Sequence, residues 1–136
     1  MSATTDTTYT LCGTTSLPFA EAVARVRETL KEEGFGVLTE IDVQATLREK
    51  LGQDVAPYLI LGACNPPYAH RALQLEPELG TLLPCNVVVY EHDGVTHLSA
   101  IDPVAMLGIV GKRELEPIAA EIQAKLEHAL TPLWET

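Results

Sequence analysis

Two cysteines occupy positions where a thiol could do chemistry. Cys64 ends the apolar run YLILGAC and precedes Asn65 and Pro66, a pair typical of the first residues of a helix. The positive end of a helix lowers the pKa of a nearby thiol, so this position favours a reactive thiolate or a metal ligand. Cys85 begins the next apolar run, CNVVVYE. Each cysteine therefore lies at a boundary between expected elements.

The chain between these cysteines is long enough to bring them together. A helix over residues 66–75 would be ~15 Å long. The nine residues 76–84 can span up to ~30 Å, so they can return the chain to the end where the helix began. We therefore expect Cys64 and Cys85 at the same end of a sheet.

A hairpin adds an acidic residue to this end. The pair Asp93-Gly94 joins two apolar runs and is typical of a two-residue turn, which sets the register of the strands. That register places Asp102 opposite Cys85. The resulting candidates for a ligand or metal site are Cys64, Asn65, Cys85 and Asp102, with Cys64 as the candidate for a catalytic role.

Each of these residues also has an ordinary structural role. Buried cysteine often acts as a small apolar side chain, and Asn65 and Asp102 suit helix caps. The sequence has no CxxC pair, no zinc-like Cys–His spacing and no HExxH. A soft metal would be held by Cys64 and Cys85 alone, or by a site completed across a dimer.

Glu40 and Asp42 form a second candidate pair on one face of an expected strand. Two carboxylates can serve as acid and base when burial separates their pKa values. An exposed strand edge and a helix cap explain the same two residues equally well. Both readings stay open at the level of sequence.

The patterns predict ten elements in the order β-α-β-α-β-α-β-β-α-α. Strands are expected over residues 7–13, 35–42, 57–63, 85–92 and 95–102, and helices over 17–33, 43–51, 66–75, 104–110 and 114–130. Ser16 is the expected cap of the first helix, and Pro132 is expected to end the last. The hairpin excludes a purely parallel sheet, so we expect an α+β two-layer sandwich. Its mixed, largely antiparallel sheet would carry helices on one face.

Composition excludes several classes of protein. The net charge of −10, from 19 acidic and 9 basic residues, argues against binding to nucleic acid or to an anionic membrane surface. Three cysteines and an N-terminus without a signal pattern indicate a cytoplasmic protein. No apolar run approaches the ~20 residues that span a bilayer. We expect residues 1–136 to form one soluble domain, with a frayed end at residues 1–6.

Three blocks of the sequence resemble one known family. The runs GACNPPYAHRAL, LLPCNVVVYE and LPFAEAVARVRETLKEEGFGVLTEIDVQATLREKLG closely resemble the uncharacterised family named domain of unknown function 302, over about residues 8–130. The resemblance implies a compact α+β domain of bacteria or archaea that is often a homodimer, with no assigned activity. The family's recognisable blocks contain Glu40, Asp42, Cys64, Asn65, Pro66 and Cys85.

Three functions are consistent with these observations. The first is a dimeric domain that binds a small molecule or a metal near Cys64 and Cys85. The second is a redox protein or enzyme that uses Cys64 as its nucleophile. The third is a structural module that dimerises through the face bearing Val88, Tyr90 and His97. The sequence identifies neither the ligand nor a cofactor.

Overall fold

Five strands form one sheet in the order β1-β5-β4-β3-β2, and all four pairings are antiparallel. The structure is a computed structural model that describes residues 7–136, so the frayed end expected at residues 1–6 lies outside the described part. The strands are β1 (Thr10–Thr15), β2 (Gly36–Asp42), β3 (Tyr58–Cys64), β4 (Cys85–His92) and β5 (Val95–Ile101).

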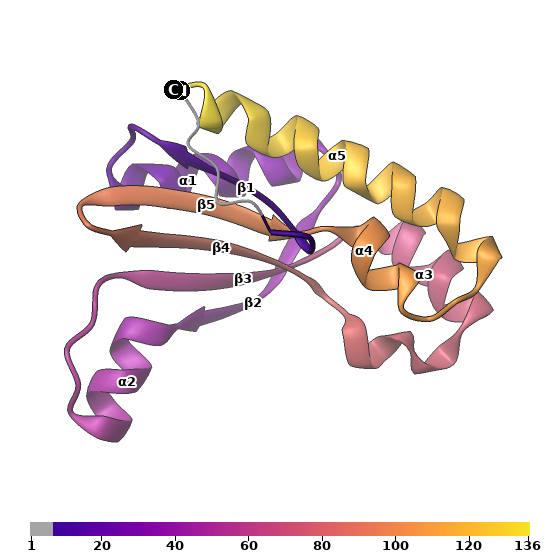
Figure 1. Cartoon of the computed structure of the whole chain (residues 1–136), viewed down its shortest axis with the longest axis horizontal. Coiled ribbons are helices and arrows are strands. Elements are labelled where there is room, and N and C mark those ends of the chain that lie inside the picture. Colours follow the sequence, from indigo (N-terminus) through magenta and orange to yellow (C-terminus); the bar gives the residue numbers. More distant parts are fainter. Residues whose placement is uncertain (1–6) are drawn as a thin grey trace.

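Two of the five helices in residues 7–136 cover one face of this sheet. The five helices are α1 (Phe19–Glu32), α2 (Val43–Leu51), α3 (Pro66–Leu75), α4 (Pro103–Gly108) and α5 (Glu116–Trp134), with 3-10 turns η1 (Pro77–Leu82) and η2 (Arg113–Leu115). The helices α1 and α5 contact each other and pack on the sheet, whereas α2 stands apart beyond β2 (Figure 1). The predicted two-layer α+β fold is thereby confirmed. Within residues 7–136, no helix is long and apolar enough to cross a membrane.

The hairpin between β4 and β5 has the predicted register. Asp93 and Gly94 both have positive φ, 51° and 77°, as a tight type I′ turn requires. The register pairs Val87 with Ala100 and Val89 with Leu98. These side chains point to the inward face of the sheet. The side chains on this inward face pack against apolar stripes of α1 and α5. The fully buried members include Leu61, Val87, Val89, Leu98, Val26, Leu30, Leu126 and Leu130.

Two helix boundaries differ from the expectation. Pro18, not Ser16, occupies the cap position of α1, because β1 continues to Thr15 and leaves Ser16 in the connection. Pro132 lies inside α5 and does not end it.

The last turn of α5 is held by contacts with the sheet. The indole Nε1 of Trp134 donates to the carbonyl oxygen of Leu98 at 2.8 Å. The ring lies so close to Gly13 that a Cβ added there would be 2.6 Å from its Cδ1 atom. These contacts hold the last turn in place even though Pro132 donates no backbone hydrogen bond. The connection over residues 76–84 is also ordered: it contains η1, whose Leu79 is buried.

Candidate functional site

Cys64 and Cys85 line the same cavity, which we call the thiol pocket. Cys85 pairs across the sheet with Ala63, the residue before Cys64, so the end of β3 lies next to the start of β4. The pocket has a volume of about 290 Å³ and lies among the end of the sheet, α3, α4 and α5. Its lining is mostly apolar and includes Cys64, Asn65, Ala72, Leu83, Cys85, Met106 and Ile122.

The connection between the two cysteines builds one side of the thiol pocket. The helix α3 leads away from Cys64, and η1 packs back against it before the chain enters β4 at Cys85. Small residues of α3, including Ala69 and Ala72, line the pocket and leave its volume open. The return path expected from the sequence is therefore the one that the chain takes.

Asn65 does not use its side chain as the expected helix cap. It occupies the cap position of α3, but its Nδ2 donates to the carbonyl oxygen of Glu33 at 3.0 Å and so ties α3 to the end of α1. The side chain is buried, with 7% exposed. Within residues 7–136 no hydrogen bond reaches its Oδ1. One acceptor on the lining of the thiol pocket is thus available to a ligand.

Burial keeps both thiols of the pocket protonated. It raises the pKa of Cys64 above its ordinary value. It raises the pKa of Cys85 to about 11, with a second contribution from the charge of Cys64. The expectation that the start of α3 would lower the pKa of Cys64 is therefore wrong. Loss of hydration outweighs the helix end, because the surrounding lining is apolar.

A metal site finds little support in this arrangement. Cysteine binds a metal as the thiolate, and both pKa values oppose deprotonation. In the described part of the chain, no group of three or more histidine, cysteine or acidic side chains gathers at a distance suited to a metal ion. Among residues 7–136, Cys64 and Cys85 thus have no third such ligand nearby.

Asp102 does not join the two cysteines. Its Oδ1 accepts hydrogen bonds from the backbone of Val104 at 2.9 Å and Ala105 at 3.4 Å, and so caps α4. The same oxygen accepts from Nε2 of Gln123 at 2.9 Å. The side chain of Asp102 is absent from the lining of the thiol pocket. The hairpin register located its backbone, but α4 and α5 set the direction of its carboxylate.

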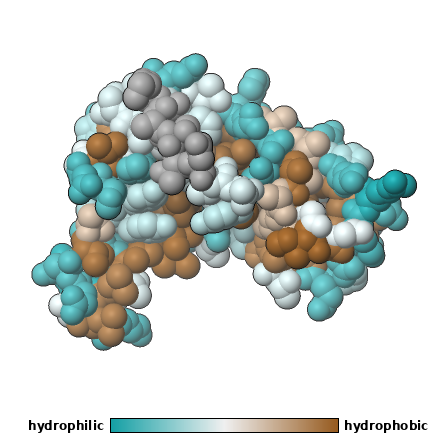
Figure 2. All heavy atoms as spheres, viewed as in Figure 1, coloured by the Kyte–Doolittle hydropathy of each residue, from teal (hydrophilic) through white to brown (hydrophobic). Residues whose placement is uncertain are grey.

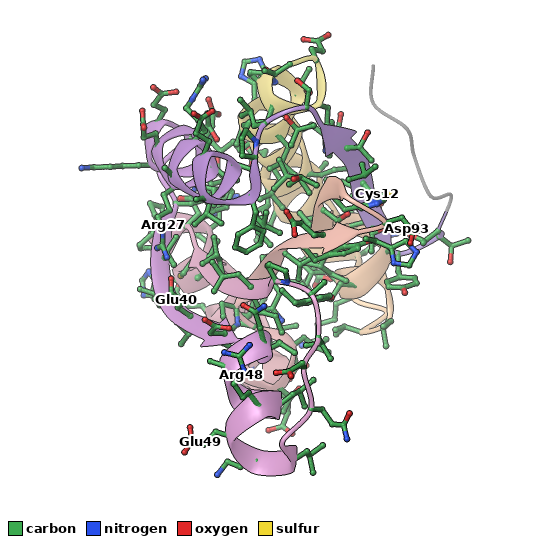
Figure 3. All side chains as sticks on the ribbon, turned by 90° about the vertical axis from the view of Figure 1, so that its left-hand side faces the viewer. Cys12, Arg27, Glu40, Arg48, Glu49 and Asp93 are labelled. Atoms are coloured by element: carbon green, nitrogen blue, oxygen red, sulfur yellow. The ribbon has the colours of Figure 1, made fainter. Side chains whose placement is uncertain are left out.

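Glu40 and Asp42 also lie outside both main cavities, and both are exposed. Glu40 forms an ion pair with Arg27 of α1, and Figure 3 shows the two labelled side chains next to each other. Asp42 caps α2, since its Oδ1 accepts from the backbone nitrogen of Ala45 at 2.9 Å. The structure gives each of them a structural partner and no partner for acid–base chemistry.

The other face of the sheet carries a larger cavity, which the sequence did not reveal. This sheet-face groove has a volume of about 710 Å³, and its floor and walls include Cys12, Tyr58, Pro84, Asn86, Val88, Tyr90, His97, Ser99 and Met106. Its strand residues alternate with the buried core residues, so they face away from α1 and α5. In Figure 2 apolar side chains gather below the centre of the molecule and over α2. The alternation of inward and outward side chains over residues 85–92 was the available sequence signal. It predicts which residues share a face of the sheet, but it does not predict a cavity on that face.

Comparisons with known proteins agree over nearly the whole chain. No curated protein matches it. A crystal structure of an uncharacterized conserved protein DUF302 from Bacillus stearothermophilus has a TM-score of 0.87 and 35% sequence identity, and the match covers 93% of this chain and 99% of that one. Residues 12–133 match the family described as "Domain of unknown function DUF302". The chain therefore belongs to the DUF302 family.

Proposed function

We propose that this protein binds a small, uncharged and mostly apolar molecule in the thiol pocket. The observation that carries the proposal is that Cys64 and Cys85, which are far apart in the sequence, line one apolar cavity of about 290 Å³. This volume is close to the lower end of the range for small-molecule sites, ~300–1,000 Å³. The ligand would accordingly be smaller than a typical cofactor.

The lining determines the charge of this ligand. Among the described residues it contains no acidic or basic side chain and no histidine. Both thiols are neutral at neutral pH because burial raises their pKa values. A charged ligand would lose its hydration without gaining a counter-charge, which costs several kcal/mol.

One polar group of the thiol pocket would orient a bound ligand. The Oδ1 of Asn65 has no hydrogen-bond donor within residues 7–136. A ligand with a single hydroxyl or N–H group would satisfy this oxygen and place its apolar part against Ala72 and Ile122. Small alcohols and primary amides have this chemistry.

The same observations favour a binding site over the two thiol-based alternatives. A thiol nucleophile and a metal ligand both need the thiolate, which the apolar lining disfavours. A neutral ligand needs only the cavity and the oxygen of Asn65. Binding of a neutral ligand therefore does not require a thiolate, whereas redox chemistry at Cys64 does.

Cyclohexanol is a suitable probe, with amide chemical shifts from NMR as the measurement. We expect saturable shifts in residues that line the thiol pocket. Cyclohexylammonium, which differs by its charge, should bind at least about tenfold weaker because of the uncompensated charge. An absence of saturable shifts at the pocket would contradict the proposal.

Filling the pocket provides the matched control. Ala72→Leu adds a side chain on the lining, where Ala72 is 3% exposed, and should weaken cyclohexanol binding at least about tenfold. Ala24→Leu makes the same change on an exposed position of α1 and should leave binding unchanged. If Ala72→Leu fails to fold, the half-buried Ala69→Leu tests the same point. Equal binding by a folded pocket-filling variant and by wild type would refute the site.

A further inference from the structure

One segment of the chain packs against no other part of the molecule closely enough to bury a residue. Residues 36–57, which form β2, α2 and the connection to β3, contain no buried residue over a run of 22. We call this segment the β2–α2 arm. Each of the other strands, helices and 3-10 turns within residues 7–136 has at least one buried residue. In Figure 1 α2 stands apart from the other helices, beyond β2 at the edge of the sheet.

The arm nevertheless exposes apolar side chains of the kind that pack in a contact. Leu38 of β2 is 67% exposed and Ile41 is 49% exposed. Along α2, Val43, Leu47 and Leu51 recur at i, i+4 and i+8 and so form one apolar stripe. A helix of nine residues is only marginally stable by itself, so α2 needs a surface against this stripe. Exposed apolar side chains gathered on one segment mark an interaction site.

The outer side of β2 is open to another strand. Within residues 7–136, β2 pairs only with β3, so the backbone groups on its other side face away from the sheet. Its seven residues include no lysine or proline, which commonly block such an edge. A register irregularity lies between Val37 and Thr39, and from Thr39 onward the strand is regular. At the opposite edge the end of the chain lies next to β1, because the backbone nitrogen of Ser16 donates to the carbonyl oxygen of Thr136 at 3.0 Å.

A second copy of the chain fits this edge by symmetry and by size. A two-fold axis across β2 pairs the strand with itself in the antiparallel direction. All four pairings within the sheet have that direction. The 22 residues of the arm also match the ~20–30 residues that each partner contributes to a contact of standard size. The arm is therefore large enough to hold two copies together.

Charge favours the same partner. Antiparallel pairing places the end of each β2, where α2 begins, beside the start of the partner's β2. Residues 31–33, just before that start, are one lysine and two glutamates, whereas residues 48–50 of α2 are an arginine, a glutamate and a lysine. A net negative segment thus meets a net positive one twice in the dimer. This local attraction matters because each chain carries a net charge of −10 and repels its copy elsewhere.

The same arrangement covers the opening of the thiol pocket. Leu38 lines this pocket and is mostly exposed, so it lies where the pocket opens to solvent. Because Leu38 lies near the start of β2, the α2 helix of a second copy would pack its apolar stripe against it. In the dimer, each pocket would then be closed by a helix from the other copy.

We propose that the β2–α2 arm is the contact of a two-fold dimer, in which β2 pairs antiparallel with β2 of a second copy. Each α2 lies over the opening of the partner's thiol pocket. The dimer itself does not depend on a ligand in that pocket. Only the effect of the dimer on ligand access rests on the function proposed above.

Light scattering on the full chain tests the contact with two matched variants. Ile41→Lys and Ile109→Lys make the same change at two exposed isoleucines, one in the arm and one after α4, where it is 77% exposed. Wild type and Ile109→Lys should have twice the chain mass of 14.7 kDa. Ile41→Lys should raise the Kd of the dimer at least about hundredfold, because each copy would bring an unpaired charge into the contact. Thermal unfolding verifies that both variants fold.

Three results of this measurement would overturn the proposal. The first is a wild-type protein that stays monomeric as its concentration is raised. The second is a folded Ile41→Lys protein that dimerises as tightly as wild type. The third is a dimer that only Ile109→Lys disrupts, since that would place the contact at the sheet-face groove.

Alkylation of Cys64 by iodoacetamide, followed for each cysteine-containing peptide by mass spectrometry, tests the position of α2. Cys64 is half-buried and lines the thiol pocket. In monomeric Ile41→Lys it should react at least about threefold faster than in the wild-type dimer, because the reaction depends on access to the thiol. Cys12 of β1, outside the arm, should react equally in both proteins. Equal rates at Cys64 would refute the placement of α2, whereas a dimer that binds no cyclohexanol would refute only the ligand site.

Discussion

Ionisation of Cys85 should destabilise the folded protein. Burial and the charge of Cys64 raise its pKa from 9.0 to about 11. A shift of two pKa units corresponds to about 3 kcal/mol between the two protonation states. Because the folded pKa is above the unfolded one, this stability is fully present below about pH 9 and is lost as the pH rises through about 11.

Urea unfolding of wild type and of Cys85→Ala at pH 7, 9 and 11 measures this effect. The variant keeps a small apolar side chain and has no thiol to ionise, so the other alkaline titrations, including that of Tyr90, are shared by both proteins. We expect the free energy of unfolding of wild type, relative to the variant, to fall by about 2 kcal/mol between pH 7 and 11, because the folded-state thiol is itself half ionised at about pH 11.

The cause of the shift can be separated into its parts. In a Cys64→Ser background the contribution from the neighbouring charge is absent, and the larger contribution from burial remains. The pH-dependent difference should therefore become smaller without vanishing. A difference between wild type and Cys85→Ala that stays constant from pH 7 to 11 would refute the reasoning on which the neutral thiol pocket rests.

Three further predictions concern the fold and its assembly. Gly62→Ala should lower stability by about 1–3 kcal/mol in thermal unfolding, because the new Cβ would overlap Oγ1 of Thr39. Asp102→Ala should cost about 1–2 kcal/mol by removing the cap of α4, whereas Asp102→Asn, which can still accept these bonds, should cost less. The homodimer stays a prediction: by light scattering, Leu51→Glu should yield a monomer, because Leu51 is 66% exposed on a helix with no buried residue. Tyr90→Glu, within the groove, should leave the dimer intact.

The elements with strong local signals were predictable from the sequence. The bounds of α2 follow from Asp42, which caps its start, and Gly52, whose φ of 65° ends it. Asp93 and Gly94 set the register of β4 and β5, and that register placed the inward and outward faces correctly. These signals act over two to four residues, so the sequence contains all the information that they need.

Side-chain directions in the candidate site were not predictable in the same way. Asn65 lies at a sequence position typical of a helix cap, but its side-chain amide donates a hydrogen bond to Glu33, which lies 32 positions earlier in the chain. Asp102 turns toward Gln123, 21 positions later. Each choice depends on a partner that the fold brings close, and no local pattern contains that partner.

What the sequence determined by itself was the set of elements, the α+β class and the meeting of Cys64 with Cys85 at one end of the sheet. Only the tertiary structure decided the state of these thiols, because their pKa values depend on how much water the surrounding helices displace. The same is true of the sheet-face groove, whose walls come from η1 and α4. A cavity is the space that distant segments leave unfilled, and so it exists only after they have packed.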